Sequence, residues 1–103
     1  PIALVEKGFP TIFIVLNDET KDLIINNVME MKARDAITIG LVPENTHDVA
    51  KILDIHMTIP CHHPILAPIV YMPPLQLIAY YAAVKRGYDP DKPRNLAKTV
   101  TVE

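Results

Sequence analysis

The sequence predicts a single small α/β domain built on a parallel sheet. Three apolar segments alternate with helical segments in the order strand, helix, strand, short helix, strand. This order is typical of parallel strands joined by right-handed crossovers. The first apolar segment, residues 11–16, has no polar face, as expected for a strand that is buried on both sides. With 103 residues, of which 50% are hydrophobic, the chain suffices for one such domain.

The remaining elements of the first half follow from capping signals and hydrophobic periodicity. Ile24, Val28 and Met31 recur at helical spacing and predict a helix over residues 18–34, which Asn17 and Asp18 are suited to cap. Further elements are predicted at residues 36–42 (strand), 46–50 (one helical turn) and 52–59 (strand).

Three strands are fewer than a doubly wound sheet usually has. The last strand alternates polar and apolar residues, so we expect it to be half exposed and to form an edge. A buried strand on the other side would lack a partner. Because such a strand would need a further neighbour, we expect the chain to be a fragment of a larger domain.

The second half predicts a long apolar helix with a kink. Pro73 and Pro74 each remove a backbone donor and clash with the preceding turn, so we expect two segments, residues 64–72 and 74–86. Gly87 is suited to end the second segment. Residues 88–103 contain a turn-rich linker and a tail without periodicity.

Composition excludes several classes of function. The net charge is −2, which argues against nucleic-acid or anionic-membrane binding. The chain contains no serine, and its three glycines are too far apart for a glycine-rich phosphate loop. A single cysteine, Cys61, cannot form an internal disulfide, so a cytoplasmic location is expected. We also expect no membrane-spanning segment and no signal peptide.

Few side chains suggest chemistry by themselves. Cys61, His62 and His63 are adjacent, and adjacent residues of an extended segment point to opposite sides, so we expect no metal site. Cys61 is expected to be a buried or half-buried thiol at a strand end. His47 and His56 are expected on exposed surface. For Lys98, a solvated tail lysine and an amine with a lowered pKa in a dry pocket remain alternatives.

The C-terminal half resembles one enzyme family. Residues 91–103 read DKPRNLAKTVTVE, and this string closely resembles the C-terminus of glutamine–fructose-6-phosphate aminotransferase (isomerising), the glucosamine-6-phosphate synthase family. Similar matches occur at residues 1–4, 67–69, 74–80 and 85–87. The chain therefore resembles the C-terminal part of the family's second sugar-isomerase (SIS) subdomain.

The resemblance implies a fold and a division of the chain. We expect a partial flavodoxin-like three-layer α/β sandwich of SIS type, with three parallel strands and a long kinked helix in residues 1–87. Residues 88–103 would form the tail that closes the sugar site.

The resemblance also implies site residues. Lys98 corresponds to the lysine that forms a Schiff base with open-chain fructose 6-phosphate, and Ala97 to a residue that lines the sugar site. The phosphate-binding Ser/Thr loop, the catalytic glutamate and the ring-opening histidine of the family fall before Pro1. Thr99 replaces the commoner serine, and Cys61 does not match the family's glutaminase nucleophile.

The implied function is a share in making glucosamine 6-phosphate from fructose 6-phosphate and glutamine-derived ammonia, in amino-sugar biosynthesis. No metal or cofactor is implied. The expected partners are the sugar phosphates, the glutaminase domain, the upstream isomerase segment and a second copy in a homo-oligomer. The chain alone is expected to be catalytically incomplete. Two alternatives stay open: a non-catalytic sugar-phosphate-binding module, and a structural half-domain that dimerises through its apolar helix.

Overall fold

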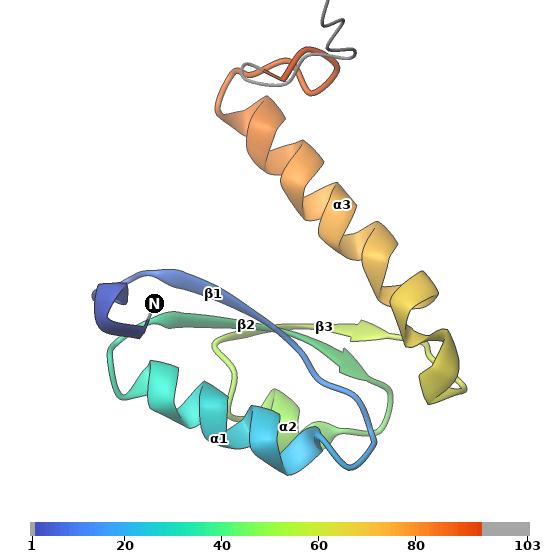
Figure 1. Cartoon of the computed structure of the whole chain (residues 1–103). Coiled ribbons are helices and arrows are strands. Elements are labelled where there is room, and N and C mark those ends of the chain that lie inside the picture. The colour runs from blue at the N-terminus through green and yellow to red at the C-terminus, as the bar shows by residue number, and fades with distance from the viewer. Residues whose placement is uncertain (1, 94–103) are drawn as a thin grey trace, which may run out of the picture. The chain divides into compact units, whose positions relative to one another are not determined.

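The computed structural model describes residues 2–93 and contains a three-stranded parallel sheet. The strands are β1 (Pro10–Ile14), β2 (Ile37–Pro43) and β3 (Ile55–Ile59), in the spatial order β1-β2-β3 (Figure 1). Since β2 lies between the other two, β1 and β3 are both edges within the described residues. The predicted α/β class and all three strands are confirmed.

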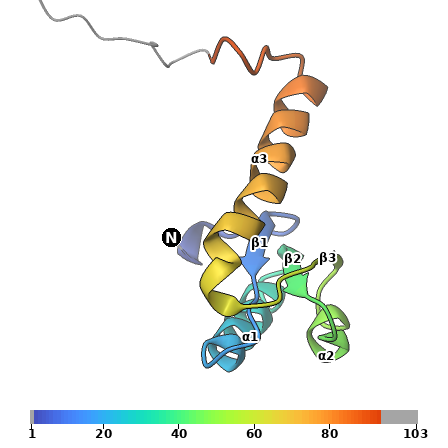
Figure 2. The same cartoon turned by 90° about the vertical axis from the view of Figure 1, so that its right-hand side faces the viewer.

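Two helices connect the strands and lie on the same face of the sheet (Figures 1 and 2). Helix α1 (Lys21–Lys32) joins β1 to β2, and the single turn α2 (His47–Ala50) joins β2 to β3. The predicted start of α1 is wrong by three residues. The Asp18 carboxylate accepts hydrogen bonds from the Thr20 amide at 2.9 Å and from the Thr20 hydroxyl, so it closes a turn before the helix instead of capping it.

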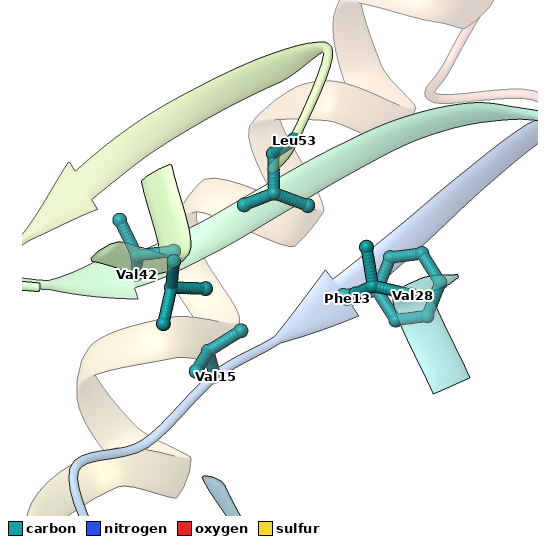
Figure 3. Close-up of a cluster of buried hydrophobic side chains, with 6 residues drawn as sticks. Phe13, Val15, Val28, Val42 and Leu53 are labelled. Atoms are coloured by element: carbon teal, nitrogen blue, oxygen red, sulfur yellow. The ribbon is translucent and has the colours of Figure 1, made fainter. Parts of the chain in front are cut away.

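The buried core lies between this face of the sheet and the two helices (Figure 3). In this view Phe13 of β1 lies beside Val28 of α1, Val42 of β2 lies on the side of Val15, and Leu53 extends from the loop before β3. Gly40 of β2 leaves the space that Leu53 fills, because a Cβ at Gly40 would clash with the Leu53 side chain. The full cluster is Phe13, Val15, Val28, Val42, Val49 and Leu53.

The opposite face of the sheet is also apolar, but much of it is exposed. The parallel register aligns Ile12 with Ile39 and Ile55, and Leu41 with Met57. Leu41 is buried, whereas Ile12 is 42%, Ile55 is 55% and Met57 is 49% exposed. We call the exposed members of this face the open face: Ile12, Ile14, Ile37, Ile55 and Met57.

After β3 the chain forms a short 3-10 turn (Pro64–Leu66) and the long helix α3 (Ala67–Lys85). The chain divides into two compact units, one ending at Tyr71 and one beginning at Met72. A further 3-10 turn (Ile2–Leu4) precedes β1.

Helix α3 continues through Pro73 and Pro74, so the expected division into two segments is wrong. Each proline removes one backbone hydrogen bond, whose acceptors would be the carbonyls of Ile69 and Val70. Ile69 is 72% exposed, so water can satisfy its carbonyl. The turns on either side of the two prolines are intact and hold the helix together.

The composition of α3 bears on the expectation that no segment spans a membrane. The 22 residues of Pro64–Lys85, with hydropathy 1.3, are long and apolar enough to cross a membrane by length and composition. One such helix is weak evidence for a membrane span. Apolar residues lie on every side of α3, and this is typical of a helix that is buried on all sides.

Candidate functional site

The carboxyl edge of the sheet contains a small hollow. In open α/β sheets this edge is where ligands bind, because the loops that follow the strands converge there. The hollow has a volume of about 130 Å³. It is lined by Leu16, Asn17, Pro43, Cys61, His62, Pro64 and Tyr71.

Local backbone contacts occupy the polar groups of the Cys61–His63 segment. The Cys61 thiol donates to the His63 carbonyl at 3.3 Å, and His63 Nδ1 accepts from the Ile65 amide at 3.3 Å, which caps the 3-10 turn. Cys61 is partly buried just after β3, as predicted. Within residues 2–93, no group of three His, Cys, Asp or Glu side chains could hold a metal ion.

Tyr71 forms the buried wall of this hollow. Its side chain is 2% exposed, and its hydroxyl donates to the Val15 carbonyl at 3.4 Å. Burial raises the pKa of Tyr71, and Cys61 raises it further. The hydroxyl therefore remains protonated at neutral pH and acts as a donor, not as a base.

A second hollow of about 320 Å³ lies between the end of β2, α2 and β3. His47 and His56 both line it, and both are exposed, as predicted. No hydrogen bond joins either imidazole to another described residue. Two solvated histidines without an orienting partner do not form an acid–base pair.

A polar network lies at the opposite, amino edge of the sheet. The Asp54 carboxylate accepts from the Thr38 amide and from the Thr38 hydroxyl, both at 2.8 Å, and from Lys32 Nζ at 3.3 Å. The Thr38 amide and hydroxyl, followed by Lys32, hold the pKa of Asp54 below its usual value. This cluster connects α1, β2 and the loop before β3, far along the strands from the ligand-binding edge, so its role is structural.

Sequence reasoning missed this network and the Tyr71 contact. Thr38 was a usable signal, because a hydroxyl in a buried strand needs a partner. Nothing in the sequence identifies Asp54 as that partner across 16 residues.

The second unit contains a larger hollow, of about 770 Å³, at the end of α3. The turn that follows the helix folds back to form one of its walls. The hollow is lined by Ala79, Tyr80, Ala83, Gly87, Tyr88, Asp89, Pro90, Lys92 and Pro93. Lys98 and Ala97, the site residues expected from the resemblance, lie outside the described residues, which end at Pro93.

Comparisons with known proteins identify the family. Residues 1–86 match the family model of the SIS domain. The glutamine–fructose-6-phosphate aminotransferase (isomerising) of Pyrobaculum aerophilum is 57% identical in sequence; the match covers the whole of this chain and 17% of that protein. The enzyme of the same name from Sulfurisphaera tokodaii is 51% identical, over the whole of this chain and 16% of that protein. The chain thus spans about one sixth of the length of these relatives.

A solved structure supports the same assignment. The C-terminal domain of glucosamine-fructose-6-phosphate aminotransferase from Francisella tularensis matches with a TM-score of 0.75 and 34% identity. The match covers 86% of this chain and 25% of the solved one. The chain therefore belongs to the SIS domain family and corresponds to the C-terminal part of glutamine–fructose-6-phosphate aminotransferases.

Proposed function

We propose that this chain is the C-terminal part of the isomerase domain of a glucosamine-6-phosphate synthase. The enzyme would make glucosamine 6-phosphate from fructose 6-phosphate and ammonia released from glutamine. The observation that carries the proposal is the match of all 103 residues to aminotransferases of this activity. The match includes the tail that contains Lys98, which a domain that only sensed the sugar would not need.

Lys98 would act as the amine that captures the open-chain sugar. Its neutral amine would attack the C2 carbonyl of fructose 6-phosphate, and loss of water would give an imine. Exclusion of water from the pocket would lower the pKa of the lysine and protect the imine from hydrolysis. Ala97, next to it, would line the sugar site.

The exposure of the open face is evidence that other parts of the polypeptide complete this domain. A parallel sheet is normally covered on both faces, and here one face leaves Ile55 and Met57 about half exposed. β1, made of Pro10, Thr11, Ile12, Phe13 and Ile14, has the composition of an internal strand, although among residues 2–93 it has a neighbouring strand on one side only. The upstream isomerase segment would cover this face, and it would also supply the phosphate grip and the proton-transfer groups.

Further partners follow from the same proposal. A glutaminase domain would deliver the ammonia, and a second copy of the chain would bury part of the apolar surface of α3. No metal or cofactor is required for imine formation or for C1–C2 isomerisation. A cytoplasmic location remains the expectation from the single cysteine.

Trapping the imine tests the proposal. Fructose 6-phosphate and borohydride are added to the chain alone and to the chain combined with the upstream isomerase segment, and peptides are mapped by mass. We expect a reduced sugar adduct on Lys98 in the combined sample only.

Two variants make the trapping experiment specific. Lys98→Arg retains the charge but cannot form the imine, so the adduct should disappear. Lys92→Arg, a matched exchange six residues earlier, should leave it intact. Absence of an adduct in a folded combined sample would contradict the proposal and favour a non-catalytic sugar-phosphate-binding module.

A further inference from the structure

Strand β3 is an exposed edge of the sheet. Among residues 2–93 its only neighbouring strand is β2, and four of its five residues are exposed. Edge strands that stay unpaired usually carry a proline or a charged side chain that keeps a second strand away. The five residues of β3 read IHMTI and include no proline, lysine, arginine, aspartate or glutamate. β3 is therefore open to pairing with a further strand.

The hydrogen bonds of β2 show which of its residues bond to β3. The Leu41 carbonyl accepts from the Val15 amide at 2.9 Å, so Leu41 bonds on the side of β1. Successive residues of a strand bond to opposite sides. Gly40 and Val42 therefore bond on the side of β3.

The register then identifies the free backbone groups of β3. Gly40 is aligned with His56, and Val42 with Thr58. A residue of a parallel strand bonds to the two residues that flank its aligned partner, so both bond to odd-numbered residues of β3. The amide and carbonyl groups of His56 and Thr58 therefore point away from β2, along the free edge.

The sequence of β3 is complementary to itself in the antiparallel orientation. About a two-fold axis at Met57, this residue faces its own copy. Ile55 then faces the partner's Ile59, and His56 faces the partner's Thr58. Apolar side chains meet on one face of the sheet, and on the other an imidazole meets a hydroxyl with which it can form a hydrogen bond. No two like charges are opposed.

The free backbone groups fit the same register. In an antiparallel pair, opposed residues alternate between those that exchange two hydrogen bonds and those that exchange none. His56 and the partner's Thr58 both present their amide and carbonyl along the edge, so they form a bonded pair. Met57 and its copy form a non-bonded pair, with Cα atoms about 4.5 Å apart. Pro60, opposite Asp54 in this register, has no amide and ends the pairing.

We propose that β3 is an interface between two copies of the protein, paired antiparallel about a two-fold axis at Met57. The two three-stranded sheets join into one continuous sheet. This edge is separate from α3 and from the open face, to which the proposed function assigns other contacts, and the inference does not depend on that function.

Disulfide cross-linking tests the register in the complete polypeptide to which the chain belongs. Every variant carries Cys61→Ala, so that the introduced thiol is the only one in this chain. Met57→Cys places two thiols at the axis, where a Cα separation of about 4.5 Å permits a disulfide. After mild oxidation, mass mapping of peptides measures the link between residue 57 and its copy.

Ile55→Cys is the matched control. It lies on the same strand and has a similar exposure, 55% against 49% for Met57. In the proposed register its copy lies four positions further along the partner strand, about 13 Å away. That separation is too long for a disulfide.

Thr58→Pro, combined with Met57→Cys, tests whether backbone pairing brings the thiols together. The proline removes an amide that donates across the edge and not to β2, so β3 should keep its place in the sheet. The melting temperature checks that this variant folds. If it does not fold, the comparison of the two cysteine variants decides alone.

Met57→Cys should cross-link about tenfold faster than Ile55→Cys, and Thr58→Pro should lower its rate to that of Ile55→Cys. Equal rates for the two cysteine variants would overturn the inference, as would a link at residue 57 that persists in folded Thr58→Pro protein. Absence of any link at residue 57 would also overturn it, and would indicate that another segment of the polypeptide occupies this edge.

Discussion

The two faces of the sheet have similar composition but opposite surroundings. On the helix-covered face, Phe13 is 9% exposed and Val42 is 1% exposed, because α1 and α2 pack over them. On the open face, Ile12 and Met57 remain about half exposed although they are equally apolar. Apolar side chains on both faces indicate a sheet that is covered on both sides in the complete protein, and α1 and α2 supply the cover of one face. The helix-covered face therefore stabilises the fold of this chain, whereas the open face is available for contact with another part of the protein.

The largest expected difference in stability is between variants of two neighbouring residues of β1, Phe13 and Ile12. Phe13→Ala should lower the free energy of unfolding by about 3–4 kcal/mol, because it leaves a cavity in the core. Ile12→Ala, on the open face, should cost about 1 kcal/mol in the chain alone. Urea denaturation of both variants measures the difference. Equal costs would show that the open face is already covered in the isolated chain.

A smaller effect on stability, one that depends on pH, is expected from Asp54 at the amino edge of the sheet. The folded-state pKa of Asp54 lies below its ordinary value of 3.8, so ionised Asp54 favours the folded state. This contribution is complete above about pH 4 and is lost as the pH falls through the folded-state pKa.

Asp54→Asn should therefore melt at a lower temperature than the wild type at pH 7, and the difference should shrink below about pH 4. Asp35→Asn is the control for removal of an exposed acidic side chain. A difference in melting temperature that did not depend on pH would contradict the assignment of this network.

The smallest effect concerns the hydroxyl of Tyr71. Tyr71→Phe retains the buried ring and removes only the donor to the Val15 carbonyl, whose length of 3.4 Å indicates a weak bond. The free energy of unfolding should fall by about 0.5 kcal/mol. A loss above about 2 kcal/mol would mean that this hydroxyl has a larger role than the contact suggests.

Local sequence signals predicted the elements well because those elements depend on local interactions. Hydrophobic periodicity located all three strands and α1, and Gly87 correctly marked the end of α3. The errors occurred where a local rule competed with another interaction. Asp18 bonds Thr20 before the helix begins, and the turns around Pro73 and Pro74 hold the helix across both prolines.

The candidate site was less accessible to sequence reasoning. The chemistry of Lys98 alone did not distinguish a solvated amine from a catalytic one, and its role came from the resemblance of residues 91–103. The Asp54–Thr38 bonds join segments that meet only in the folded sheet. Pairings of this kind depend on register and crossover geometry, which composition and spacing do not encode.

The most direct test of the account is whether the open face binds the upstream isomerase segment. Titration calorimetry compares the wild-type chain with Met57→Asp on the open face and Met29→Asp on α1, two methionines of similar exposure, 49% and 53%. We predict that Met57→Asp weakens binding at least tenfold, because it places a charge in an apolar contact, whereas Met29→Asp binds like the wild type. Equal binding by all three proteins, or none by the wild type, would contradict the claim that this face completes the domain.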